Sequence, residues 1–192
     1  MIKSSGFFKN HHFKTNMKKF YPLLFLLAII IVSRLFIHLP NFVPVSAIAL
    51  CAGVYLGKKW ALILPLVGLF VSDLFLGFYS WPIMFSVYGS FALIGIMSWW
   101  LKKHKNITNI AAASLGSAVL FFVVTNFSVW AFSPWYEKSL VGLMYCFELA
   151  LPFFRNTLAG DLFYVAVFFA IFELALNHGR VLKALRISKQ TA

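Results

Sequence analysis

The sequence predicts an all-α fold, a polytopic membrane bundle of about six transmembrane helices with an extra re-entrant or interfacial helix on the outer side. Hydrophobic residues make up 61% of the 192 residues and charged residues only 11%, and the mean hydropathy is +0.86. That composition leaves too little polar surface to cover a soluble globule. The apolar residues also gather in runs of about one membrane crossing, with basic residues between the runs.

The expected helices follow these apolar runs in chain order. The first run leads into Arg34 and not into a small-residue cleavage site, so we interpret it as an uncleaved helix. Pro40 and Pro44 then turn the chain. The expected transmembrane helices are Phe20 to His38, Val45 to Gly57, Trp60 to Phe78, Pro82 to Leu101, Ile107 to Phe132 and Thr157 to Leu176. They form one domain, residues 17–179, between a disordered basic tail at 1–16 and a cytoplasmic basic tail at 180–192.

The basic residues indicate the orientation of the bundle. The net charge is +12, which in a soluble chain would suggest a nucleic-acid partner. Fourteen of the 17 lysines and arginines, however, lie in four patches: the tail through Lys19, Lys58-Lys59, 102–105 and 180–189. By the positive-inside rule these patches are cytoplasmic. We therefore expect a multi-pass inner-membrane protein with both termini in the cytoplasm, the lipid bilayer as partner and no nucleic acid.

The same rule explains the extra outer helix. If the patches at 102–105 and 180–189 are both cytoplasmic, the chain between Phe132 and Arg180 crosses the membrane once, although it holds two apolar stretches. The shorter stretch, Leu140 to Leu151, carries Glu148 and ends at Pro152. It is therefore predicted to be re-entrant or interfacial.

Polar side chains within the apolar runs are the candidates for a binding site. They are costly in a bilayer, about 2.5–3.5 kcal/mol for a charged group on insertion scales, and so tend to be paired or functional. Under the predicted topology, four helices bring such groups to similar depth near the outer face, which indicates an outward-facing pocket. The candidate substrate-binding residues are Arg34, Asn41, Asp73, Asn126, Trp130, Arg155, Asn156 and Asp161.

Local spacing refines the expected pocket. Asn126 and Trp130 share one helix face, as do Thr157 and Asp161. Asn156 is a candidate N-cap of the last helix, and the free N–H groups there, beside Arg155, would attract an anion. An alternative remains open, in which Arg34 and Arg155 only neutralise Asp73 and Asp161 inside the bundle; the sequence does not tell which arginine meets which aspartate. Histidines and cysteines are scattered, so neither a metal site nor a cofactor is predicted.

Small residues in the second helix offer a close-contact face. Ala49, Gly53 and Gly57 recur every four residues, a spacing that lets another helix approach closely. Two interpretations stay open. The contact is either internal to the bundle, or it is a docking face for a partner subunit.

Four sequence strings resemble those of an uncharacterised bacterial inner-membrane family. The strings are Asn41-Phe-Val-Pro-Val-Ser-Ala-Ile-Ala-Leu, Ser72-Asp-Leu-Phe-Leu-Gly77, Thr125-Asn-Phe and Phe154-Arg-Asn-Thr-Leu-Ala-Gly-Asp161. That family is similar in size and layout to the S components, the substrate-binding subunits of energy-coupling-factor transporters. This resemblance implies a bundle that captures a vitamin or metal at its outer face and docks on a coupling membrane subunit with ATPases. The chain has no Walker motif, so ATP would have to be used by other subunits.

Three functions are therefore considered. The leading hypothesis is capture or transport of a small anionic or zwitterionic molecule. An intramembrane hydrolase, with Asp73 and Asp161 as an acid/base pair, is the enzymatic alternative, although no catalytic residue is assigned. The third is a non-catalytic assembly or scaffold protein that uses its small-residue faces.

Overall fold

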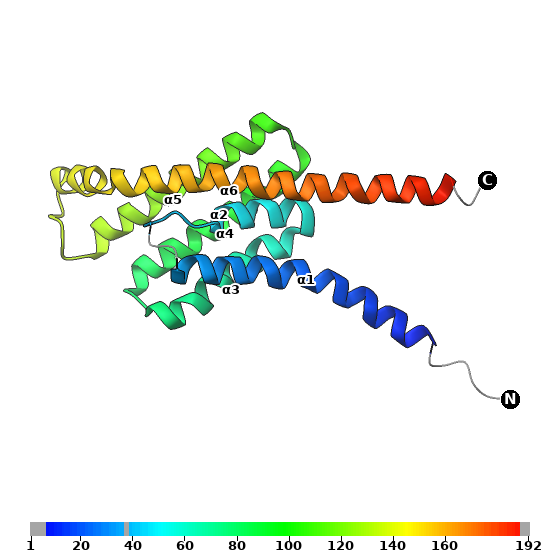
Figure 1. Cartoon of the computed structure of the whole chain (residues 1–192). Helices are drawn as coiled ribbons and strands as arrows, with labels where there is room; N and C mark the ends of the chain where they lie inside the picture. Colours follow the sequence, from blue (N-terminus) through cyan, green and yellow to red (C-terminus); the bar gives the residue numbers. More distant parts are fainter. Residues whose placement is uncertain (1–6, 37–38, 189–192) are drawn as a thin grey trace.

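The computed structural model describes residues 7–36 and 39–188, and every regular element within them is helical (Figure 1). The elements are α1 (Phe7–Phe36), α2 (Val45–Cys51), the π-helical η1 (Ala52–Leu56), α3 (Lys58–Leu76), α4 (Trp81–Lys103), α5 (Ile107–Phe132) and α6 (Leu140–Ser188). The predicted all-α bundle is confirmed. The predicted helix end at His38 and the outermost residues of both tails, 1–6 and 189–192, lie outside the described residues.

Four helices are long and apolar enough to cross a membrane. They are Lys58–Leu76, Trp81–Lys103, Ile107–Phe132 and the Leu140–His178 part of α6, while Tyr21–Phe36 and Val45–Leu56 are shorter apolar helices. Large apolar side chains lie on the outside of the bundle, with Phe75 72% and Phe85 71% exposed. Such a surface is suited to lipid and not to water. The predicted membrane-helix character is therefore supported.

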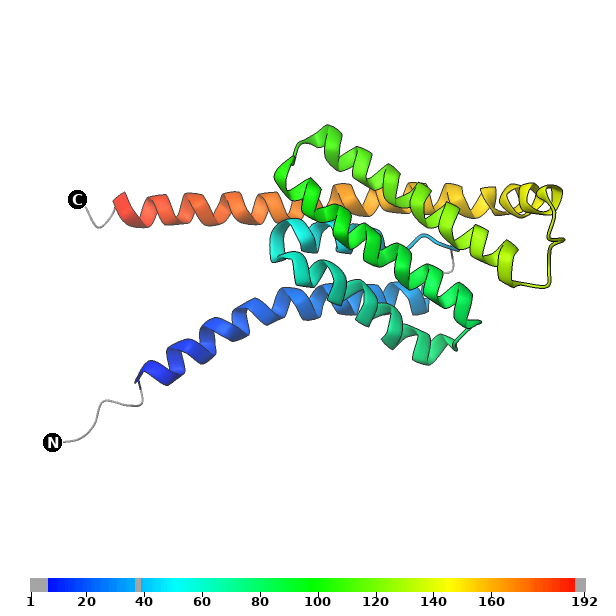
Figure 2. The ribbon, with the colours of Figure 1, turned by 180° about the vertical axis from the view of Figure 1, so that it is seen from behind.

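The chain alternates between two ends of the bundle. In Figures 1 and 2 the start of α1 and the end of α6 point to the same side, and the turns after η1 and after α4 lie at that side as well. These turns carry Lys58-Lys59 and the basic run 102–105. The connections 39–44, 77–80 and 133–139 lie at the opposite end, which we call the loop end. This alternation is the one that the charge pattern predicts.

The short helix α2 is the centre of the bundle and not one of its outer members. Every residue of α2 is buried, and the helix contacts α3, α4, α5 and α6. Gly53 in η1 packs so closely on α4 that a Cβ atom there would lie 2.4 Å from the Ser98 Cβ. The small-residue contact is thus internal, and Ala49 and Gly53 do not form a free docking face. Gly57 ends η1 with φ of 116°, a conformation suited to glycine.

The last helix differs from its prediction. One continuous helix, α6, replaces the expected separate outer helix and sixth transmembrane helix. The expected break at Pro152 was wrong, because a proline within a long apolar helix bends it without ending it when neighbouring helices support both parts. Both views show the yellow start of α6 turned out of line with the orange remainder. At the other end of the chain, residues 7–16, expected to be disordered, are helical.

Candidate ligand-binding site

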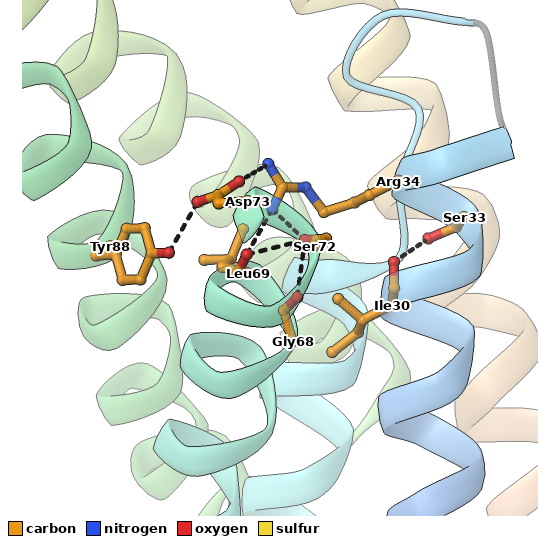
Figure 3. A network of polar contacts seen from close by, with 8 residues as sticks. All are labelled: Ile30, Ser33, Arg34, Gly68, Leu69, Ser72, Asp73 and Tyr88. Carbon is orange, nitrogen blue, oxygen red and sulfur yellow. Dashed lines mark hydrogen bonds and ion pairs between the residues drawn. The ribbon is translucent and has the colours of Figure 1, made fainter. Parts of the chain in front are cut away.

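The first polar cluster joins α1, α3 and α4 near the loop end (Figure 3). Arg34 Nη2 lies 2.8 Å from Asp73 Oδ1, forming an ion pair. Arg34 Nη1 donates to the Ser72 hydroxyl at 2.5 Å and to the Leu69 carbonyl at 3.1 Å. Tyr88 donates to the other Asp73 oxygen at 2.8 Å. Asp73 is only 1% exposed, and its Oδ1 is held by the ion pair with Arg34 while its Oδ2 accepts from Tyr88, so the charges of this cluster balance each other.

Local packing explains why Arg34 reaches Asp73. At Gly68 in α3 an added Cβ would lie 2.6 Å from the Ile30 Cγ2, so the glycine lets α1 and α3 approach closely. Ser72 stands one turn further along α3, where its hydroxyl donates to the Gly68 carbonyl and accepts from Arg34. The structure therefore shows that Asp73 pairs with Arg34, which the sequence left open. It also favours the structural interpretation for this pair.

The second polar cluster lines a cavity of about 20 Å³ among α2, α4, α5 and α6. By size this cavity has room for about one water molecule. Asp161 is 2% exposed, and Ser46 lines the same cavity. The second carboxyl oxygen, Oδ2, is buried with no hydrogen-bond partner. The lining residues are Asn41, Val43, Ser46, Phe91, Phe121, Thr157 and Asp161.

The non-helical segment 39–44 forms one wall of this cavity. Asn41 has φ of 62°, a left-handed conformation that asparagine tolerates better than most residues. Phe42 then packs against α6, where Gly160 leaves room for it: a Cβ there would lie 3.2 Å from the Phe42 Cα. The Phe42 ring also lies 5.4 Å from that of Tyr164. The sequence strings that begin at Asn41 and end at Asp161 are therefore direct neighbours in space.

The remaining predicted site residues lie elsewhere. Asn126 donates to the Phe122 carbonyl of its own helix at 2.7 Å. Trp130 Nε1 donates to the Glu137 carbonyl at 2.9 Å and so closes the α5–α6 connection. Arg155 is exposed. Asn156 lies inside α6, so it is not an N-cap, and no helix N-terminus stands beside Arg155 to bind an anion.

The structure thus divides the single pocket expected from the sequence into two separate polar clusters, and Trp130 belongs to neither, because it bonds to the connection between α5 and α6. Asn41, Thr157 and Asp161 come together, whereas Arg34 and Asp73 satisfy each other. Sequence reasoning missed Ser46, Ser72 and Tyr88. Ser46 could have been found, because it is a polar residue within the short apolar run that follows Pro44. Tyr88 gave no such signal, since tyrosines are common in membrane helices.

Fold and clusters together define a polytopic helical membrane protein with a buried acidic cavity between its helices. The chain belongs to the family of unknown function DUF6580, whose model matches residues 14–185. No curated protein and no solved structure matches the chain.

Proposed function

We propose that the protein is a membrane-embedded capture or transport protein for a small solute, with its site in the cavity around Asp161. The observation that carries this proposal is the Asp161 carboxyl, buried in the bundle with one oxygen unpartnered. An acceptor left unsatisfied in an apolar interior costs about 1–3 kcal/mol. We infer that the unpaired Asp161 oxygen finds a partner in another state of the protein, and the simplest such state is the one with a bound solute.

The shape of the chain around the cavity supports the same proposal. Backbone outside a helix is tolerated at membrane depth where it is buried in protein or lines a cavity. Segment 39–44 with the short buried helix α2 fits that description. Discontinuous helices of this kind form the solute sites of many transporters. A molecule larger than one water would require segment 39–44 to move away from α6.

The cavity also revises the expected charge of the solute. Arg155, expected to attract an anion, is exposed and does not line the cavity. The lining contributes acceptor oxygens and one carboxyl group, and no basic side chain. We therefore propose a neutral or cationic solute in place of an anionic one.

The resemblance to S components remains a hypothesis about the mode of action. In that hypothesis a coupling membrane subunit with ATPases would dock on the bundle. Because Ala49 and Gly53 are buried, docking would have to use another surface. The same burial weakens the scaffold interpretation. The hydrolase interpretation also loses support, since Asp73 is held by Arg34 and Tyr88 while Asp161 lines a different site.

Orientation is part of the proposal and has its own test. We propose a bacterial inner-membrane protein whose basic end, with both termini, faces the cytoplasm. Single cysteines at Lys58 and Lys103 should then resist a membrane-impermeant thiol reagent in intact cells, in a background without the two native cysteines. Cysteines at Ser80 and Glu137 should react. External labelling at Lys103 would reverse the orientation and place the cavity's loop end in the cytoplasm.

Solute capture can be tested by native mass spectrometry of the detergent-purified protein. The wild type should retain a small mass in excess of the chain. The variant Asp161→Asn should lose most of that occupancy, whereas Glu148→Gln, which changes an exposed carboxyl group of the same helix, should retain it. A wild-type protein that shows only its chain mass, even from native membranes, would contradict capture of a tightly held solute.

A further inference from the structure

The Asp161 cavity has the composition of a cation site. Its polar lining supplies a carboxylate from Asp161, hydroxyl oxygens from Ser46 and Thr157 and a side-chain amide from Asn41. Thr157 donates its hydroxyl proton to the Phe153 carbonyl at 3.0 Å, which leaves its oxygen lone pairs available. Carboxylate, hydroxyl and amide oxygens are hard ligands, which suit hard cations. We propose that this cavity binds one monovalent cation of the sodium class, a proposal that rests on the proposed function and names its solute.

Charge balance favours a single positive charge. Among the described side chains the ion pairs are Arg34 with Asp73 and Lys105 with Glu173, so Asp161 takes part in neither. The cavity wall therefore carries one acidic group and no basic one. A divalent ion is usually held by several carboxylates. In the described part of the chain no group of three or more histidine, cysteine, aspartate or glutamate side chains could hold a metal ion.

Size and wall chemistry support the same conclusion. A cavity of about 20 Å³ accepts one water-sized particle, so a bare small cation fits and an organic cation does not. Val43, Phe91 and Phe121 complete the wall with apolar surface. Such surroundings lower the local dielectric constant and strengthen the attraction between a carboxylate and a cation. Asn41 both lines the cavity and is exposed, which makes it the point of entry from the loop end.

The test is thermal unfolding of the full-length protein in detergent, at constant ionic strength, with NaCl replacing choline chloride. Because a ligand that binds the folded state stabilises it, Tm should rise by roughly 3 °C for each tenfold increase in Na⁺ above its Kd. Choline is too large for the cavity and is the inert salt. KCl in the same series measures selectivity, and a smaller rise than with NaCl is expected.

Two variants connect the effect to the cavity. Asp161→Asn should abolish the Na⁺-dependent rise, and the exposed-carboxyl control Glu148→Gln should keep it. Ser46→Ala leaves the carboxylate in place and should raise the apparent Kd for Na⁺ roughly tenfold. This second variant decides the matter even if Asp161→Asn folds poorly.

Clear outcomes would overturn the inference. Equal Tm values for the wild type in NaCl, KCl and choline chloride would mean that the cavity holds water only. A Na⁺ effect that persists in both Asp161→Asn and Ser46→Ala would place the cation elsewhere. A retained organic molecule in native mass spectra without any Na⁺ effect would overturn the cation site while preserving solute capture. A Na⁺-dependent rise in Tm without any retained organic molecule would support the cation site and contradict capture of an organic solute.

Discussion

Replacing Asp73 by Ala is expected to destabilise the protein by about 3–5 kcal/mol, the typical effect of removing one partner of a buried ion pair. The change leaves the Arg34 guanidinium, whose side chain is only 16% exposed, without its counter-charge. It also leaves the Tyr88 hydroxyl without its acceptor. Thermal unfolding in detergent, together with the yield of monodisperse protein, measures the effect.

The double change Arg34→Met with Asp73→Ala separates an orphaned charge from lost packing. Removing both charged groups together should cost less than Asp73→Ala alone, because no unpaired charge remains in the bundle. The stability of Arg34→Lys should lie between those of the wild type and Asp73→Ala. A lysine ammonium group cannot reproduce the planar guanidinium group that contacts Asp73, Ser72 and Leu69 at once. If Asp73→Ala is tolerated as well as the exposed change Glu148→Gln, the pair is not a structural element.

Much of the fold follows from properties that the sequence states directly. Apolar runs and basic patches predicted the bounds of α3, α4 and α5 to within a few residues, because a bilayer imposes both length and charge on each crossing. The burial of α2 was less predictable. Its run, Val45 to Gly57, has only 13 residues and is short for a crossing, yet hydropathy alone cannot distinguish a lipid-facing helix from one surrounded by other helices.

The errors share one physical cause, which is that tertiary contacts override local signals. Pro152 is a strong local breaker, but α6 continues through it. The candidate site residues were grouped by predicted depth and by shared helix face, and neither property states which side of a helix faces the core. Asn41, Thr157 and Asp161 come together because Gly160 admits Phe42 against α6, a packing contact between residues far apart in the chain. Asn126 and Trp130 have a suitable depth under the predicted topology, but Asn126 bonds within its own helix and Trp130 bonds to the connection between α5 and α6.

Replacing Gly53 by Ala is expected to cost about 1–3 kcal/mol, a typical effect of overpacking a core. The new Cβ would lie 1.7 Å from the Ser98 Oγ and 2.4 Å from the Ser98 Cβ. The hydroxyl can rotate away, but the Cβ is fixed to α4, so the two helices must separate. Gly89→Ala is the matched control, because no heavy atom lies within 4 Å of its added Cβ. It should be neutral or slightly stabilising, since alanine favours a helix more than glycine does.

The compensating change decides whether this contact is the cause. Combining Gly53→Ala with Ser98→Gly removes the obstructing Cβ and Oγ from α4, so the pair should recover much of the lost stability in a double-mutant cycle. Thermal unfolding of the four proteins in one detergent gives the coupling energy. A docking face would behave differently: Gly53→Ala would unfold with the wild type while a partner failed to co-purify. Equal Tm values for Gly53→Ala and Gly89→Ala would therefore contradict the internal contact and restore η1 as a candidate surface for a partner.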